Sequence, residues 1–167
     1  MEQAELRWEA NISRQAIRLF RGESEVASIQ FNSLFSSKAT AKFGEKSFTF
    51  LSDGKTKTGI EVYSDNQKVE ALKMNIWSSA ATTDDQQWKW KNNTFRTKWH
   101  WKNPDMRKVI DAQTTDSFGL QGKVVKNSPV SGTDEERLLL TGLYLHYFTY
   151  RNELLIVIVL VLVIVIT

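Results

Sequence analysis

The stretch that decides the fold is 133–153, TDEERLLLTGLYLHYFTYRNE, and the aliphatic run LLIVIVLVLVIVI follows it at 154–166. The acidic start predicts a helix N-terminus, with Thr133 as the N-cap and Glu136 completing a capping box. From Arg137 to Tyr150 the helix is apolar on nearly every side. A helix without a polar face is either enclosed by protein or surrounded by lipid, so this segment predicts a buried central helix over about 134–152.

The sequence before this helix consists of short β-like runs separated by turn residues. Gly and Asn tolerate positive φ, and Pro fixes φ, so they mark the turns between the runs. The spacing predicts about eleven or twelve short antiparallel strands in a sandwich or a barrel. The expected strands are Leu6–Ser13, Ala16–Phe20, Glu25–Phe31, Lys38–Phe43, Ser47–Leu51, Thr58–Ser64, Val69–Trp77, Gln87–Lys91, Thr94–Trp101, Lys108–Ala112 and Ser117–Val125.

Composition limits the function classes that this chain can belong to. The 167 residues suit one domain, and a hydrophobic content of 41% with six Trp and nine Phe favours a packed core. The absence of cysteine excludes disulfides and thiol chemistry, and two histidines leave little basis for a metal site. We therefore expect no cofactor and no metal. The acidic segment Met1–Glu9 does not resemble a signal peptide, so we expect an intracellular protein.

The aliphatic tail, residues 153–167, has two interpretations. As a helix, Leu154–Ile166 extends about 20 Å, less than the roughly 30 Å of bilayer hydrocarbon. Its Val and Ile content nevertheless makes exposure to water untenable. The tail is therefore either a membrane anchor or a segment buried in the domain or in an oligomer.

A tryptophan-rich hairpin at Gln87–Lys102 contains the candidate binding residues. The period of two places Trp88, Trp90, Phe95, Trp99 and Trp101 on the inner face, with Asn92-Asn93 as the turn. The outer face then carries the candidate headgroup-binding residues Lys89, Lys91, Arg96, Lys98, His100 and Lys102. This face indicates binding of anionic phospholipid headgroups, or else an ordinary solvated surface over an aromatic core. Nucleic acid is disfavoured because stacking on bases needs exposed aromatics.

No catalytic constellation is evident. The carboxylate clusters at Asp84-Asp85 and at Asp134-Glu135-Glu136 lie at a turn and a helix start, where acidic residues have structural uses. His146 lies within the apolar helix, which predicts a core histidine with a local hydrogen bond. We therefore expect a protein that is not an enzyme, with a hydrolase whose site is unrecognised as the minor alternative.

The order of short strands followed by an apolar helix resembles the tubby C-terminal-like superfamily, which includes LURP-one-related proteins and phospholipid scramblases. The resemblance covers most of residues 5–152, with Trp88–Trp101 similar to the late strands and Glu136–Glu153 similar to the central helix. It implies a mainly β fold: a closed barrel over residues 1–152, threaded by a hydrophobic C-terminal helix. Because the tail extends past the family pattern, Leu154–Ile166 is a second candidate for the threaded helix.

Two functions follow from these expectations. The first is a non-enzymatic binding module that contacts anionic phospholipid at a membrane surface through the basic hairpin face, tethered by the tail. The second is a soluble structural or interaction protein whose tail is buried in the fold or in an oligomer.

Overall fold

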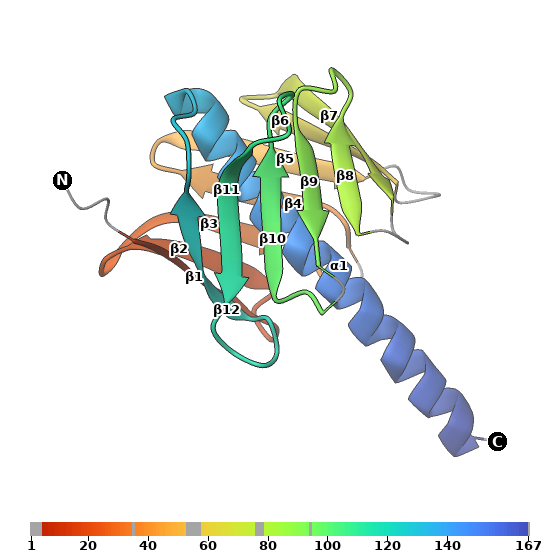
Figure 1. Ribbon diagram of the computed structural model, residues 1–167. Coiled ribbons are helices and arrows are strands. Elements are labelled where there is room, and N and C mark those ends of the chain that lie inside the picture. Colours follow the sequence, from red (N-terminus) through yellow and green to blue (C-terminus); the bar gives the residue numbers. More distant parts are fainter. Residues whose placement is uncertain (1–4, 35, 53–57, 76–78, 94, 167) are drawn as a thin grey trace.

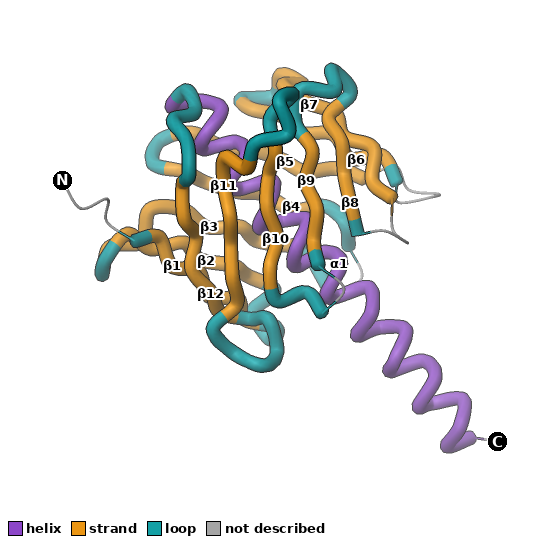
Figure 2. Tube along the Cα trace, in the orientation of Figure 1, coloured by secondary structure: helices purple, strands orange, loops and turns teal. Residues whose placement is uncertain are grey.

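The computed structural model describes residues 5–34, 36–52, 58–75, 79–93 and 95–166, and it shows a closed antiparallel barrel around one helix (Figures 1 and 2). The twelve strands are β1 Leu6–Asn11, β2 Ala16–Arg21, β3 Ser24–Phe31, β4 Ala39–Phe43, β5 Lys46–Ser52, β6 Gly59–Ser64, β7 Gln67–Asn75, β8 Ala80–Thr83, β9 Lys89–Asn92, β10 Lys98–Lys102, β11 Lys108–Thr114 and β12 Gln121–Lys126. The helix α1 spans Gly132–Ile166.

Each strand pairs with its neighbours in sequence, and β1 closes the barrel by pairing with β12. The closing ladder runs from Leu6 opposite Val124 to Glu9 opposite Gln121. Closure leaves no strand edge unpaired, which removes the hazard that open sheets present for edge-to-edge association. The predicted mainly β barrel with a threaded C-terminal helix is therefore confirmed.

The first half of α1 fills the barrel lumen. Its residues from Leu138 to Phe148 are all buried, and the strands contribute large inward side chains that pack around them: Trp8, Phe31, Phe50, Trp90, Trp99 and Trp101. The indole Nε1 of Trp101 donates a 2.8 Å hydrogen bond to the carbonyl of Leu138. Gly142 lies against the same wall, because a Cβ there would come within 2.5 Å of the Trp99 ring and 2.8 Å of Trp101 Nε1.

The second half of α1 leaves the barrel and projects from it as a continuous helix (Figure 1). The helix runs unbroken through Arg151–Glu153, so the polar residues there do not end it. The threaded segment is thus the one that begins at Leu138, and the alternative that Leu154–Ile166 threads the barrel is wrong. The interpretation that the tail is buried in the barrel is also wrong, since every side chain from Ile156 to Val165 is exposed.

Local predictions failed at three places, the first of which is the strand expected over Ser117–Val125, which begins only at Gln121. The strand β8 was missed because Ala80–Thr83 is short and built of small side chains with little intrinsic β signal. The strand expected over Thr94–Trp101 begins only at Lys98, so the turn extends past Asn92-Asn93 through Thr97. Thr94 itself, like residues 76 and 77 of the expected strand Val69–Trp77, lies outside the described residues.

The helix start lies two residues earlier than the predicted capping box. The first helical backbone bond runs from the Glu135 amide to the Ser131 carbonyl, at 2.8 Å, and the Ser131 hydroxyl donates to Asp134. Ser131 is therefore the N-cap, with Asp134 as its acidic partner, and Thr133 lies inside the first turn.

Candidate functional site

A basic wall covers the outer surface of the barrel over β9 to β12. We define it by the outward side chains Lys89, Lys91, Lys98, His100, Lys102, Lys108 and Lys123. Strand register sets them in rows. Lys89 lies opposite Lys102, and Lys91 lies opposite His100. Lys98 lies opposite Gln113 on β11, and Gln113 in turn lies opposite Lys123 on β12. Five of the six predicted binding residues therefore lie on one surface.

Arg96 is the predicted residue that does not belong to the basic wall. It lies in the loop between β9 and β10, and its guanidinium turns toward α1, where it donates a 2.9 Å hydrogen bond to the Thr149 carbonyl. It also forms an ion pair with Glu153. Strict alternation failed here because the loop breaks the period of two; Phe95, predicted to face inward, is instead exposed. Arg96 fastens the barrel to the helix where the helix leaves it.

Two lysines of the wall were missed by the sequence reasoning. Lys108 and Lys123 come from β11 and β12, which lie outside the predicted hairpin and follow β10 in the order of the sheet. They line a groove of about 570 Å³ on the outer surface, together with Lys98, His100 and Asp111. The alternation within Gln121–Lys126 did mark Lys123 as outward, but only the sheet register shows which outward residues are neighbours.

Carboxylates neutralise only part of the basic wall. Lys108 pairs with Asp111 at 3.2 Å, and Lys123 pairs with Glu5 at 2.7 Å. The other lysines, Lys89, Lys91, Lys98 and Lys102, form no ion pair within the described part of the chain. Burial and the neighbouring lysines, Lys108 first among them, lower the pKa of His100. The wall therefore presents positive charge through its lysines, with a neutral imidazole between them at neutral pH.

Arg151 makes a second attachment where α1 leaves the barrel. This buried side chain donates hydrogen bonds to the carbonyls of Ser33, Leu34 and Ser36 in the loop between β3 and β4. Its guanidinium also lies over the Phe31 ring, 4.5 Å from the centroid. With Arg96 on a different loop, the helix is held to two loops of the same mouth of the barrel.

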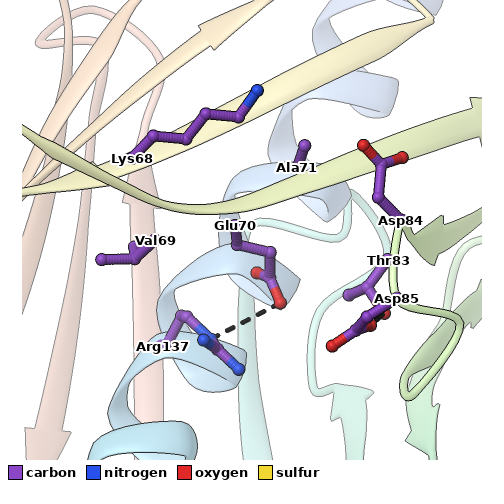
Figure 3. A pocket seen from close by; sticks show the side chains of 8 residues that line it. All are labelled: Lys68, Val69, Glu70, Ala71, Thr83, Asp84, Asp85 and Arg137. Atoms are coloured by element: carbon purple, nitrogen blue, oxygen red, sulfur yellow. Dashed lines mark hydrogen bonds and ion pairs between the residues drawn. The ribbon is translucent and has the colours of Figure 1, made fainter.

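A pocket of about 370 Å³ lies at the opposite mouth, near the start of α1 (Figure 3). The Glu70 side chain is only 5% exposed, and its Oε1 lies 3.5 Å from Arg137 Nε on the helix. Its Oε2 has no hydrogen-bond partner among the described residues, and burial raises the pKa of this carboxyl to about 7. Asp85, on the same pocket, accepts bonds from the Thr83 hydroxyl and the Gln87 amide, so it stabilises the turn.

No group of three or more His, Asp or Glu side chains in the described residues is arranged to hold a metal ion. His146 is fully buried: its Nε2 donates to the Gly119 carbonyl at 3.0 Å, and its Nδ1 faces the Asn92 amide. Burial lowers the pKa of His146 to about 4, so the ring is neutral at neutral pH. The prediction of a core histidine is confirmed, but its hydrogen bond runs to Gly119 in the barrel wall and is not local in sequence.

Comparison with known proteins adds no further constraint. No protein-family model matches this chain, and no curated protein or solved structure is significantly similar to it. The resemblance to the tubby C-terminal-like superfamily therefore stays a prediction, and the function has to be argued from the wall, the helix and its tail.

Proposed function

We propose that this protein is a non-enzymatic binding module tethered to a membrane by the second half of α1, with its basic wall contacting anionic phospholipid headgroups. The observation that carries the proposal is the tail. Side chains from Ile156 to Val165 are 42–76% exposed, with no polar residue among them. By length and composition α1 qualifies as a membrane span, and its most apolar window is only 17% buried, unlike the core helix of a soluble protein. The part outside the barrel, about 20 Å long, is what inserts as the tether.

The occupant that best covers this tail is a lipid bilayer. The exposed fraction is similar for all side chains from Ile156 to Val165, so the apolar surface extends around every side of the helix and is not confined to one stripe. A partner helix packs along one stripe and leaves the remaining sides in water. Hydrocarbon surrounds a helix completely, and burying each Val, Leu or Ile side chain contributes about 1.5–3 kcal/mol. A helix also satisfies its backbone hydrogen bonds internally, as hydrocarbon requires.

The basic wall supports the choice of anionic lipid as the ligand. A lysine held near an anionic membrane surface contributes about 1 kcal/mol of attraction, and the effect falls off within a Debye length. Lys98 and Lys123 lie in the row nearest the mouth from which the tail projects, because β10 begins and β11 ends at that mouth. We expect these two lysines to contribute most to the attraction. Lys98 forms no ion pair with a carboxylate among the described residues.

The test is binding of the full chain to floated vesicles of neutral phosphatidylcholine with and without anionic lipid, at low and high salt. We expect association with both vesicle types through the tail, and an added, salt-sensitive association with anionic vesicles through the wall. The double substitution Lys98→Glu with Lys123→Glu should remove most of the added part. Lys42→Glu, an exposed lysine on β4, is the matched control for charge reversal.

Two results would contradict the proposal separately. Equal binding to neutral and anionic vesicles at low salt would remove the headgroup interaction. A full chain that stays in solution, in a discrete detergent-free oligomer, would remove the tether and favour an interaction protein assembled through its tails.

A further inference from the structure

We infer that the mouth of the barrel from which α1 projects lies in the interfacial layer of the bilayer, with Phe95 and Phe118 inserted beside the tail, so that the barrel has one fixed orientation on the membrane. We call this mouth the exit rim and define it by the loops 12–15, 32–38, 93–97 and 115–120, residues 35 and 94 excepted. The inference rests on the proposed tether and goes beyond it, because a tether alone leaves the barrel free to tilt.

The first observation is the exposure of two aromatic side chains. Phe95 is 85% exposed and Phe118 is 71% exposed, more than any other large apolar side chain of the described barrel. A soluble protein gains nothing from two phenylalanines in water, and exposed apolar groups that gather on one surface mark interaction sites. Aromatic rings are favoured at the boundary between hydrocarbon and headgroups.

The second observation is where these two side chains lie. Both belong to loops at the end of the barrel from which the tail projects (Figure 1). Phe95 precedes Arg96, which bonds to Thr149 and Glu153 immediately before the aliphatic run. Phe118 precedes Gly119, whose carbonyl accepts the hydrogen bond from His146. The chain therefore attaches both aromatic loops directly to the helix that enters the bilayer.

The third observation is that charge differs between the two mouths. In the described loops of the exit rim, Arg14 and Lys38 are exposed, and the acidic Asp116 is engaged by the amides of Leu120 and Gln121. The opposite mouth, which we call the start rim, carries exposed carboxylates in its turns: Glu23, Glu45, Asp65, Asp84, Asp85 and Asp105. Arg107 is the exposed basic residue of those turns. Asp134 and Glu135 in the first turn of α1 are paired with Arg137 and Lys126. An anionic membrane surface repels the start rim and attracts the exit rim.

The attachments by Arg96 and Arg151 turn insertion of the tail into positioning of the barrel. Because both guanidinium groups hold loops of the exit rim to α1 at or just before the start of the aliphatic run, tail and rim move as one unit. Insertion of the tail therefore brings the exit rim to the headgroups and holds the start rim, with the pocket around Glu70, away from the membrane.

The experiment uses the absence of cysteine in the chain. Four single-cysteine variants of the full chain carry an environment-sensitive NBD fluorophore: Phe95→Cys and Phe118→Cys on the exit rim, Met106→Cys on the start rim, and Val161→Cys in the tail. Met106 is the matched control because it is an exposed apolar side chain in a loop of the opposite mouth. Each variant is bound to vesicles of phosphatidylcholine with phosphatidylserine, and quenching by aqueous iodide is compared with quenching by lipid-borne nitroxide.

We expect blue-shifted emission, quenching by nitroxide and loss of iodide quenching at Phe95, Phe118 and Val161, with the reverse pattern at Met106. If the two rim positions are as accessible to iodide as Met106 while Val161 is in lipid, the fixed orientation is wrong and the tether stands. If Val161 is itself accessible to iodide, the tether fails.

A second measurement needs no substitution. Hydroxyl-radical footprinting of the unmodified chain should show Phe95 and Phe118 protected when vesicles are added, while Met106 is oxidised to the same extent with and without them. Equal oxidation of the phenylalanines in both conditions would overturn the inference.

Discussion

The two halves of helix α1 have a similar apolar content and opposite surroundings. Leu138 to Phe148 lies inside the barrel, whereas Ile156 to Val165 lies outside it. The inner half varies in size and polarity: Gly142 lets a tryptophan wall approach, and His146 and Arg151 have specific partners on the strands and loops. The outer half contains only Leu, Ile and Val, with nothing for a protein surface to recognise. A side chain in a protein core has to match its neighbours in shape and in hydrogen bonding, whereas a side chain in hydrocarbon only has to be apolar.

The difference between the two halves is tested most directly by making the same substitution in each of them. Leu143→Ala removes a fully buried side chain from the barrel lumen and should lower the free energy of unfolding by about 2–5 kcal/mol. Leu160→Ala, on the same helix but 56% exposed, should change barrel stability by less than about 0.5 kcal/mol. Urea unfolding in nonionic detergent, followed by tryptophan fluorescence, measures both. Equal losses would mean that the tail is part of the folded core.

A glycine substitution tests how closely the inner half packs. Gly142→Ala should raise helix propensity by about 1 kcal/mol, but its Cβ would meet the rings of Trp99 and Trp101. We expect overpacking to dominate, with a net loss of about 1–3 kcal/mol. Gly132→Ala is the control, because a Cβ there meets nothing within 4 Å, and it should be neutral or slightly stabilising. Thermal unfolding in detergent distinguishes the two; a stabilised Gly142→Ala would show that the helix is not pressed against this wall.

A pH series tests the buried carboxyl of Glu70 at the start rim. Because burial raises the pKa of Glu70 to about 7, the folded chain holds a proton there that the unfolded chain releases above about pH 4.5. Stability contributed by this group is therefore present at low pH and lost as the pH rises through 7. Glu70→Gln should be more stable than the unmodified chain at pH 8 by about 1–2 kcal/mol, and the difference should vanish near pH 5.

The control for this series is Glu23→Gln, which removes one carboxylate from an exposed turn of the same rim. Denaturant midpoints at several pH values give the comparison. A Glu70→Gln variant that is less stable at pH 8 would show that its pairing with Arg137 outweighs the cost of burying the charge.

The smallest expected effect concerns the start of the inner half. Ser131→Ala removes the N-cap hydroxyl and should cost about 0.5–1 kcal/mol. Thr133→Ala, at the position that the sequence pattern favoured, should cost less, since Thr133 lies inside the first turn. The same detergent unfolding assay measures both variants. A larger loss of stability for Thr133→Ala would mean that Thr133, and not Ser131, acts as the N-cap.

Sequence reasoning placed most of the strands and five of the candidate residues correctly, for identifiable reasons. Period-two alternation marks Trp90, Trp99 and Trp101 as inward and Lys98 as outward, because a paired strand keeps the pleat. The same rule failed for Phe95 and Arg96, since residues in a loop follow no period. Lys108 and Lys123 were missed because closeness across a sheet depends on strand order and register, which alternation does not contain.

The sequence by itself determined the alternation of each strand, the apolar character of α1 and the presence of a segment that water cannot surround. These are local properties, set by backbone geometry and by the solvation of individual side chains. Only the tertiary structure decided which apolar segment fills the barrel, that Arg96 and Arg151 hold it there, and that Phe95 and Phe118 lie on loops at the mouth from which it leaves. Those outcomes depend on which groups meet across the closed barrel, where a few ångströms of register determine whether a side chain finds a partner, a wall or solvent.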